Sequence, residues 1–151
     1  MIEETFIIIK PNAVASGLIG EVLHRYETAR FRLVAMKALQ ASRERMEEFY
    51  AEHKGQYFFE RLVGFMTSGP IVVAVLSGEN VIAGARAING ATDPTKAAPG
   101  TIRQAFAPTM NANIVHSSDS PESAAREIAF WFGPDERIAY ELRPQLAQPW
   151  P

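Results

Sequence analysis

Cysteine is absent from the chain of 151 residues. Without thiols there can be no disulfide bond, no thiolate metal site and no cysteine nucleophile. A charge excess is also missing, because 15 Lys and Arg residues face 17 Asp and Glu residues. That balance provides no general attraction to nucleic acid or to an anionic membrane, so we predict no membrane partner and no specific nucleic acid partner.

A long apolar segment is missing as well. No run of apolar residues approaches the ~20 that a membrane-spanning helix needs. At the N-terminus, the segment MIEETFIIIK places acidic side chains ahead of a short apolar run, which is the wrong order for a signal peptide. We therefore expect a cytoplasmic protein.

Two common phosphate-binding motifs do not occur. No glycine-rich turn follows the first apolar run, as a Rossmann domain requires, and no G-x-x-x-x-G-K-[ST] segment is present to form a P-loop. Hydrophobic residues still make up 47% of the chain, and no break in composition or internal repeat divides it. These features predict one globular domain of another fold class.

The spacing of apolar residues alternates between strand and helix patterns. Short β-branched and aromatic runs predict strands at 5–9, 31–39, 71–77 and 113–115. Helical spacing predicts helices within 16–30, 42–54, 56–68, 80–90 and 120–132, with one or two helical turns at 101–106. This order favours an α+β fold, a ferredoxin-like α/β sandwich in which helices cover a four-stranded antiparallel sheet.

Three polar residues stand where helix N-caps are expected. Ser42, Asn80 and Ser120 each precede a predicted helix, and their side chains can accept a hydrogen bond from the first turn. Pro121 then occupies the first helical position, which needs no backbone donor.

The three histidines have different surroundings. His24 falls on the polar side of its helix and is expected to be exposed and inert, whereas His53 ends an apolar stripe and is expected to cap or pack. His116 stands between a short apolar run and a helix start, where the helix dipole favours a bound anion. A neutral imidazole there is a competent nucleophile at pH 7. Local sequence alone leaves a nucleophile and a packed, silent side chain equally open.

An acidic residue on the following helix bears on this choice. Glu127 lies at the edge of the apolar face of that helix, so its carboxylate can turn back and orient the ring of His116; an interfacial ion pair is the alternative. Protein metal ligation is not expected, because one neighbouring histidine and Asp119 do not make a site.

Cations are scattered along the chain at ends of predicted elements. Lys10 ends the first strand, Arg86 lies late in a short helix, and Arg103 follows a long irregular loop. Each alone is most often a solvated surface charge. Together with Thr92 they can clamp a polyphosphate, for which arginine is the natural bidentate partner.

Taken together, these segments resemble the nucleoside diphosphate kinase family. The segments TFIIIKP, GLIGEVLHRYE, SGPIVVAVLSGEN, GATDP…PGTIR and NIVHSSDS…ESAAREI…WF recur in the order and at the spacing of that family. The resemblance implies a kinase domain at 1–135. The proline-rich tail at 136–151 is longer than the kinase chemistry needs, and we predict that it packs on the domain or on a neighbouring subunit.

The resemblance also implies a reaction. A nucleoside triphosphate donates its γ-phosphoryl group to His116, forming a pros-phosphohistidine, which then passes the group to a different nucleoside diphosphate. Mg²⁺ is the implied cofactor and is carried by the nucleotide phosphates, with no ligand from a protein side chain.

Site residues follow by matching positions to the family pattern. Ser118 and Glu127 position the histidine, and Phe58 stacks on the base with Met110 facing it across the ring. Contacts to phosphates or ribose fall to Lys10, which also assists catalysis, and to Tyr50, Arg86, Thr92, Arg103 and Asn113. Stacking with few hydrogen bonds to base edges is expected to tolerate any base.

Some positions depart from the family pattern. Ser117 replaces the usual glycine after the nucleophile, Asn12 replaces an aspartate, and Gln56-Tyr57 replaces Arg-Pro. Because a serine restricts φ and adds a side chain near the phosphate, a reduced rate is one expectation. A nucleotide-binding regulator without useful catalysis is therefore an alternative. A nucleic-acid-binding module is a third, which the absence of a basic stripe disfavours.

The family resemblance further implies a homo-oligomer. Pro94 lies in the loop that the family uses near its three-fold contacts, which favours a hexamer over a tetramer.

Overall fold

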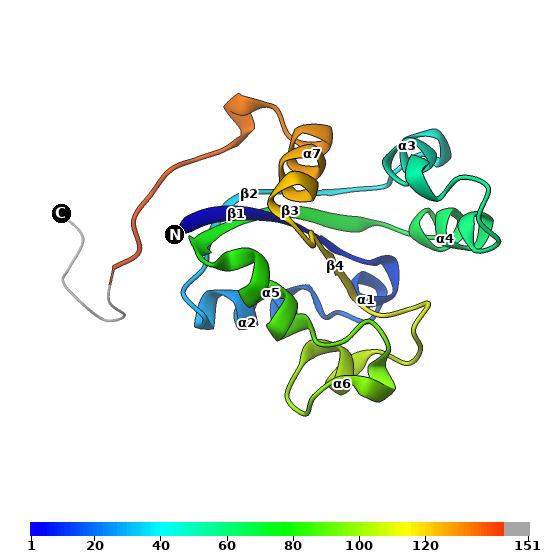
Figure 1. Cartoon of the computed structure of the whole chain (residues 1–151), viewed down its shortest axis with the longest axis horizontal. Helices are drawn as coiled ribbons and strands as arrows, with labels where there is room; N and C mark the ends of the chain where they lie inside the picture. The colour runs from blue at the N-terminus through cyan, green and yellow to red at the C-terminus, as the bar shows by residue number, and fades with distance from the viewer. Residues whose placement is uncertain (144–151) are drawn as a thin grey trace.

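A four-stranded antiparallel sheet forms the centre of the computed structural model, which describes residues 1–143 (Figure 1). The strands lie in the order β2-β3-β1-β4. Their bounds are β1 (Ile2–Ile9), β2 (Arg32–Leu39), β3 (Ile71–Glu79) and β4 (Val115–Ser117). The predicted α+β sandwich with a four-stranded antiparallel sheet is confirmed.

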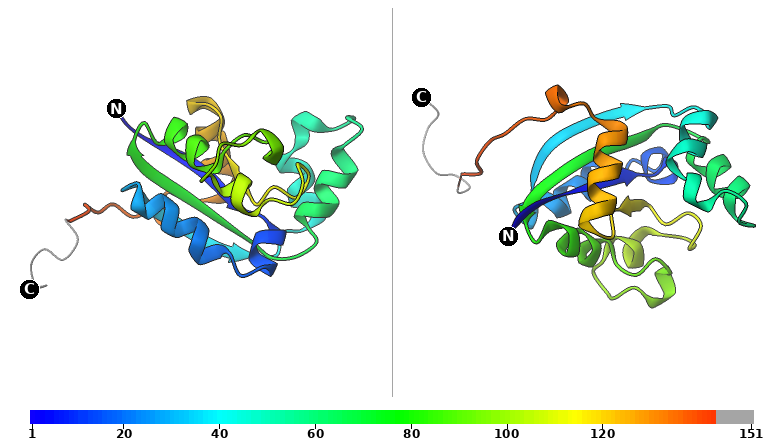
Figure 2. Two further views of the ribbon diagram at one scale, coloured as in Figure 1. Left: turned by 90° about the horizontal axis from the view of Figure 1, so that it is seen from below. Right: turned by 45° about the horizontal axis from the view of Figure 1, so that its top comes forward.

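Helices cover both faces of this sheet (Figure 1). One face carries α3 (Arg43–Phe49), α4 (Phe59–Met66) and α7 (Pro121–Trp131), and α7 lies across β1 (Figure 2). The other face carries α2 (Ile19–Thr28), α5 (Val81–Asn89) and α6 (Ile102–Phe106). The remaining helical segments are α1 (Pro11–Ala15) and the 3₁₀ turns Ala51–His53, Pro94–Lys96 and Pro134–Glu136.

The central strand β1 is buried on both sides. Phe6 and Ile8 pack into the core beneath α3, α4 and α7, while Ile7 and Ile9 pack into the core beneath α2, α5 and α6. This alternation follows from the two-residue period of a strand, and it explains why the segment reads as a continuous apolar run.

The predicted caps differ in outcome. Ser42 and Ser120 accept hydrogen bonds from the first turns of α3 and α7, as predicted. Asn80 stands at the N-cap position of α5, but its φ is +49° and its side chain makes no capping bond, so that prediction is wrong. Oε2 of Glu3 on β1 accepts instead from the backbone N of Ile82, at 3.0 Å.

The strand that carries the candidate nucleophile is shifted from its predicted place. Ile114 adopts a φ of +78°, a conformation that a strand cannot continue through, so β4 begins only at Val115. His116 consequently lies inside β4, where it pairs with Ile8, and not beyond the strand end.

The segment after α7 runs back along the outer edge of the sheet. The backbone N of Ile138 donates to the O of Val34 at 2.9 Å. The hydroxyl of Tyr140 accepts from the N of Leu33 at 2.7 Å and donates to its O at 3.1 Å. The rest of the tail, 144–151, lies outside the described residues, and so does any prediction of where it packs. Within residues 1–143, no helix combines the length and apolar character needed to cross a bilayer.

Candidate active site

A cavity of about 450 Å³ opens beside β4 and collects residues from distant parts of the chain. Lys10 comes from the end of β1, Arg86 from α5 and Glu127 from α7. The predicted site residues that line it are Lys10, Arg86, Thr92, Arg103, Asn113, His116 and Glu127. The fold thus brings the candidate nucleophile and the scattered cations to one place.

A second hollow of about 490 Å³ adjoins the first. Phe58 and Met110 line it, and it shares Lys10, Thr92 and Asn113 with the first cavity. One compartment is therefore cationic and holds the histidine, while the other offers an aromatic ring and a thioether. Such a pair of compartments suits a ligand with an anionic end and a flat apolar end.

His116 is held in one orientation by its neighbours. Its ring lies 5.9 Å from that of Phe49, edge to face, and 6.1 Å from that of Phe6. Nε2 lies 2.8 Å from Oε1 of Glu127, which is buried. A carboxylate can only accept here, so Nε2 carries the proton and Nδ1 keeps its lone pair. The arrangement therefore makes Nδ1 the nucleophilic nitrogen.

Glu127 is itself held from behind. The hydroxyl of Ser118 donates to Oε1 of Glu127 at 2.8 Å, and the backbone N of Phe6 donates to that hydroxyl at 3.3 Å. Ser118 is 1% exposed and does not line the cavity. Its contact with the nucleophile therefore runs through Glu127.

Arg103 is buried and ties three segments together. Its guanidinium donates to the backbone O of Gly90 at 2.7 Å, of Val115 at 2.6 Å and of Asn113 at 3.3 Å. Burial lowers the pKa of this arginine. These bonds hold a positive charge rigidly at the cavity wall.

Lys10 lies close to that charge. Its Nζ donates to Oδ1 of Asn113 at 2.6 Å. Burial, together with repulsion from Arg103, lowers the pKa of Lys10 to about 7. Two like charges held together in a partly buried cavity are stabilised by a bound anion, which marks the cavity as an anion site.

Tyr50 is the predicted nucleotide contact that the fold does not bring to either cavity wall. It is buried, its ring packs edge to face on Phe49 at 4.8 Å, and burial raises the pKa of its hydroxyl.

Other residues line the cavity that holds His116 without having been predicted as ligand contacts. They are Glu52, His53, Ser117, Asp119, Ser123 and Arg126. Arg126 lies 3.8 Å from Glu52 and 4.0 Å from Glu127. Its position next to Glu127 in α7 is the feature of the sequence from which its place at the cavity could have been predicted. As expected, His24 is exposed.

The side chain of Ser117 does not lie beside the ring of His116, although the two residues are adjacent in the sequence. Ser117 pairs with Ile7 in β4, so its side chain points to the opposite face of the sheet from His116. Its φ is not left-handed, and its Oγ accepts from Nδ2 of Asn89 at 3.0 Å. The backbone at this position therefore does not require a glycine.

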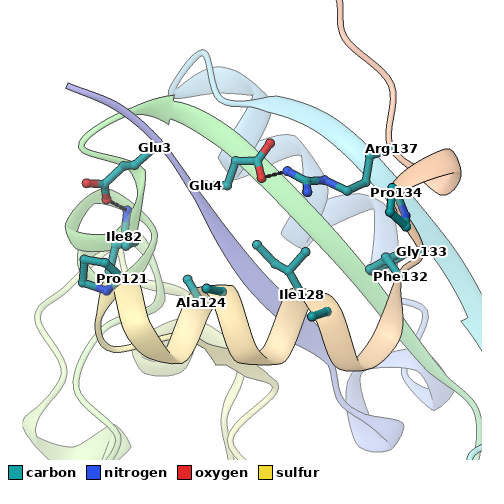
Figure 3. A pocket seen from close by; sticks show the side chains of 12 residues that line it. Glu3, Glu4, Ile82, Pro121, Ala124, Ile128, Phe132, Gly133, Pro134 and Arg137 are labelled. Carbon is teal, nitrogen blue, oxygen red and sulfur yellow. Dashed lines mark hydrogen bonds and ion pairs between the residues drawn. The ribbon is translucent and has the colours of Figure 1, made fainter.

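A further hollow, of about 580 Å³, lies alongside α7, next to Glu3 and Glu4 of β1 and to Pro134 (Figure 3). Ile128, Ala124 and other apolar side chains line it. Its carboxylates are engaged, because Glu3 accepts from the N of Ile82 and Glu4 pairs with Arg137. Among the described residues that line it there is no histidine, serine or lysine, so it does not offer the chemistry of the first cavity.

Metal-ligating side chains are not clustered in residues 1–143. No group of three or more His, Asp or Glu side chains there could hold an ion. The carboxylates at the wall of the cavity that holds His116 are Glu52, Asp119 and Glu127, and Glu127 is engaged with Nε2 of His116.

Comparison with known proteins agrees with this geometry. The family model of nucleoside diphosphate kinase matches residues 3–137. A nucleoside diphosphate kinase of Carboxydothermus hydrogenoformans is 52% identical over 92% of this chain and 93% of its own length. One from Pelotomaculum thermopropionicum is 49% identical over 93% of this chain and 94% of its own length.

Solved structures give the same result. A crystal structure of the Aquifex aeolicus nucleoside diphosphate kinase superposes with a TM-score of 0.89 at 42% identity, covering 91% of this chain and 100% of that one. A nucleoside diphosphate kinase family protein from Babesia bovis gives a TM-score of 0.88 at 40% identity, covering 93% and 95%. The match of the family model over most of the chain, joined to these identities, shows that the chain belongs to the nucleoside diphosphate kinase family.

Proposed function

We propose that this chain is an active nucleoside diphosphate kinase that works by a ping-pong mechanism through phosphorylation of His116. The observation that carries the proposal is the His116 ring, held through Nε2 by Glu127, with Nδ1 free at a cavity lined by Lys10, Arg86 and Arg103. A nucleophile beside fixed cations is what phosphoryl transfer requires, because positioning and electrostatic stabilisation supply most of its catalysis.

In the first half of the reaction, Nδ1 of His116 attacks the γ-phosphorus of a nucleoside triphosphate. The Nδ1–P bond forms as the bond from phosphorus to the β–γ bridging oxygen breaks, and that oxygen leaves with the diphosphate. Nε2 keeps its proton and donates a hydrogen bond to the carboxylate of Glu127, which stabilises the positive charge that develops on the ring. The second half runs in reverse, with the terminal oxygen of a different diphosphate as the attacking group.

The two adjoining hollows support a nucleotide pose. We assign the base to the slot between Phe58 and Met110, and the phosphates to the cavity that holds His116. Arg86, Arg103 and Thr92 contact the phosphates, while Lys10 and Asn113 stand where the two hollows meet. A base held by stacking alone leaves its edges unread, which accounts for use of any base.

Mg²⁺ enters this site as part of the substrate. A cavity lined by Lys10, Arg86 and Arg103 suits polyphosphate oxygens. Among the described residues, its carboxylates belong to no group of three or more side chains that could hold an ion. We therefore propose that the ion is bound by the nucleotide phosphates, where it neutralises charge during transfer.

A coupled assay tests the proposed function. Phosphoryl transfer from ATP to a non-adenine diphosphate, followed by the appearance of the new triphosphate, is the expected result. Nucleotide binding without transfer would overturn it in favour of the nucleotide-binding regulator.

Nucleotide binding should depend on pH through Lys10. The pKa of about 7 in the free protein means that Lys10 is mostly uncharged at pH 8. Bound phosphates favour the charged form, so binding at pH 8 takes up close to one proton, and affinity falls by up to about tenfold for each pH unit above 7. Calorimetry in two buffers of different ionisation enthalpy measures this uptake.

The Lys10→Met variant is the control, and in it the uptake at pH 8 should vanish. Equal heats in both buffers with the unmodified chain would contradict the assignment. The same shift affects folding: the pKa of Lys10 is 10.5 before the shift, so an unfolded chain binds more protons than the folded one between about pH 7 and 10.5. The contribution of Lys10 to stability therefore rises with pH across that window.

We propose, finally, a cytoplasmic homo-oligomer made of kinase domains at 1–135, with a hexamer favoured and a tetramer possible. The tail at 136–151 then packs on its own domain or on a neighbouring subunit. The contacts of Ile138 and Tyr140 with β2 support the first of these two surfaces.

Truncation after Tyr140 tests the second surface, because it keeps those contacts and removes residues 141–151. We expect the truncated chain to sediment as a smaller assembly than the intact chain. Equal sedimentation coefficients after allowance for mass would contradict a role of the tail in assembly.

A further inference from the structure

Three buried polar side chains form a hydrogen-bonded chain on the face of the sheet opposite α7. The hydroxyl of Tyr26 in α2 donates to Oδ1 of Asn89 at 2.5 Å, and Nδ2 of Asn89 donates to Oγ of Ser117 at 3.0 Å. Their exposed fractions are 1%, 0% and 8%. Both ends of the Asn89 amide are thus satisfied in a place where an unpaired amide would be unfavourable.

Asn89 lies directly before a sharp turn of the backbone at the end of α5. It is the last residue of α5, which packs against both α2 and β4 (Figure 1). Gly90 follows with a φ of +88°, and a Cβ there would lie 2.5 Å from Oγ1 of Thr101. The carbonyl of Gly90 also receives the bond from Arg103. The backbone conformation at Gly90 is therefore fixed by its positive φ, by the close approach of Thr101 and by the bond from Arg103.

Two phosphate contacts flank this turn. Arg86 precedes Asn89 by one helical turn, and Thr92 lies in the loop just after Gly90. Both side chains line the cavity that holds His116. Whatever fixes Asn89 therefore also fixes the positions from which these two side chains reach the phosphates.

Ser117 is the partner of Asn89 in the hydrogen bond described above. It directly follows His116 in β4, a three-residue strand at the edge of the sheet that, within residues 1–143, pairs with β1 alone. A strand this short has few backbone bonds to hold it in place. The bond from Asn89 to Ser117 therefore joins the end of α5 to the residue next to the nucleophile.

We propose that Asn89 and Ser117 form a positioning pair that holds Arg86 at a fixed distance from His116 during phosphoryl transfer. The inference rests on the proposed function. It also gives Ser117 a purpose: the usual glycine of the family has no side chain to receive the Asn89 amide, so the serine is a partner of Asn89 and not a defect beside the nucleophile.

Removing either member of the pair should slow phosphorylation of His116 without weakening nucleotide binding. We expect Ser117→Ala and Asn89→Leu each to lower the rate of phosphohistidine formation from ATP by roughly 5- to 20-fold. The half-saturating ATP concentration should change less than about twofold, because both variants keep every side chain that the proposed function assigns to the nucleotide. Rapid-quench labelling over a range of ATP concentrations separates the two quantities.

Two further variants test the pairing itself. The double variant Asn89→Leu/Ser117→Ala should be no slower than the slower single variant, since both remove the same bond. Ser117→Thr keeps the hydroxyl and suits a strand, so it should retain the rate within about twofold.

Tyr26→Phe is the matched control for a purely structural effect. It removes the bond at the far end of the same buried chain and leaves the bond between Asn89 and Ser117 in place. Its melting temperature should fall, as in Ser117→Ala, while its labelling rate stays at the level of the unmodified chain.

The inference is overturned if Ser117→Ala is labelled at the unmodified rate, or if Tyr26→Phe loses as much rate as Ser117→Ala. These outcomes are distinct from failure of the proposed function, which would appear as an unmodified chain that takes up no label. If Asn89→Leu does not fold, the comparison of the alanine and threonine variants of Ser117 still decides.

Discussion

His116→Ala is expected to abolish phosphoryl transfer. Nδ1 is the atom that carries the phosphoryl group between the two nucleotides, and alanine offers no replacement, so the loss should reach roughly 10⁴-fold or more. The fold should survive, because the paired backbone of β4 is unchanged and the His116 side chain is only partly buried. The coupled assay gives the loss, and a thermal melt verifies the fold.

His24→Ala is the matched control for this variant. His24 is exposed on α2, away from the cavity, and its removal should leave both labelling and turnover unchanged. A His116→Ala protein that still acquires label from ATP would show that another residue is the acceptor.

Glu127→Ala is expected to give the second largest loss, roughly 10²- to 10³-fold in kcat. The carboxylate is the acceptor for Nε2 of His116 and for the hydroxyl of Ser118. Without it the ring is free to turn and the proton is no longer held on Nε2, so Nδ1 loses both its orientation and its lone pair for part of the time. Nucleotide affinity should change little.

Glu127→Gln separates orientation from charge. The amide oxygen can still accept from Nε2, but the negative charge that stabilises the phosphorylated ring is gone, so an intermediate loss of about tenfold is expected. Glu122→Ala, an exposed carboxylate on the same helix, is the control and should be neutral. Full kcat in Glu127→Ala would contradict the role assigned to this residue.

Much of the fold could be predicted from the sequence because its determinants are local. The runs that became β1 and β3 are buried on both faces, so their continuous apolar character was visible. The caps Ser42 and Ser120 act within a single helical turn. The prediction for Asn80 was wrong because the true acceptor, Glu3, lies on another strand and far away in the chain.

The candidate active site could be predicted less well from short stretches of sequence, because its residues come from distant parts of the chain. Spacing left His116 undecided, and it was the family resemblance across separated segments that brought Lys10, Arg103 and Glu127 into one hypothesis. The hydrogen bond between Asn89 and Ser117 depends on the register of β4 against β1, which the sequence does not reveal. Strand register also explains why Ser117 faces away from the nucleophile it follows.

The whole mechanism depends on Nδ1 of His116 as the carrier of the phosphoryl group. This role is tested by ³¹P NMR of the protein after incubation with ATP and Mg²⁺, combined with peptide mapping of the base-stable, acid-labile adduct. We predict a pros-phosphohistidine resonance assigned to His116 that disappears when a nucleoside diphosphate is added. A resonance on another residue, on Nε2, or one that persists after that addition would contradict the mechanism.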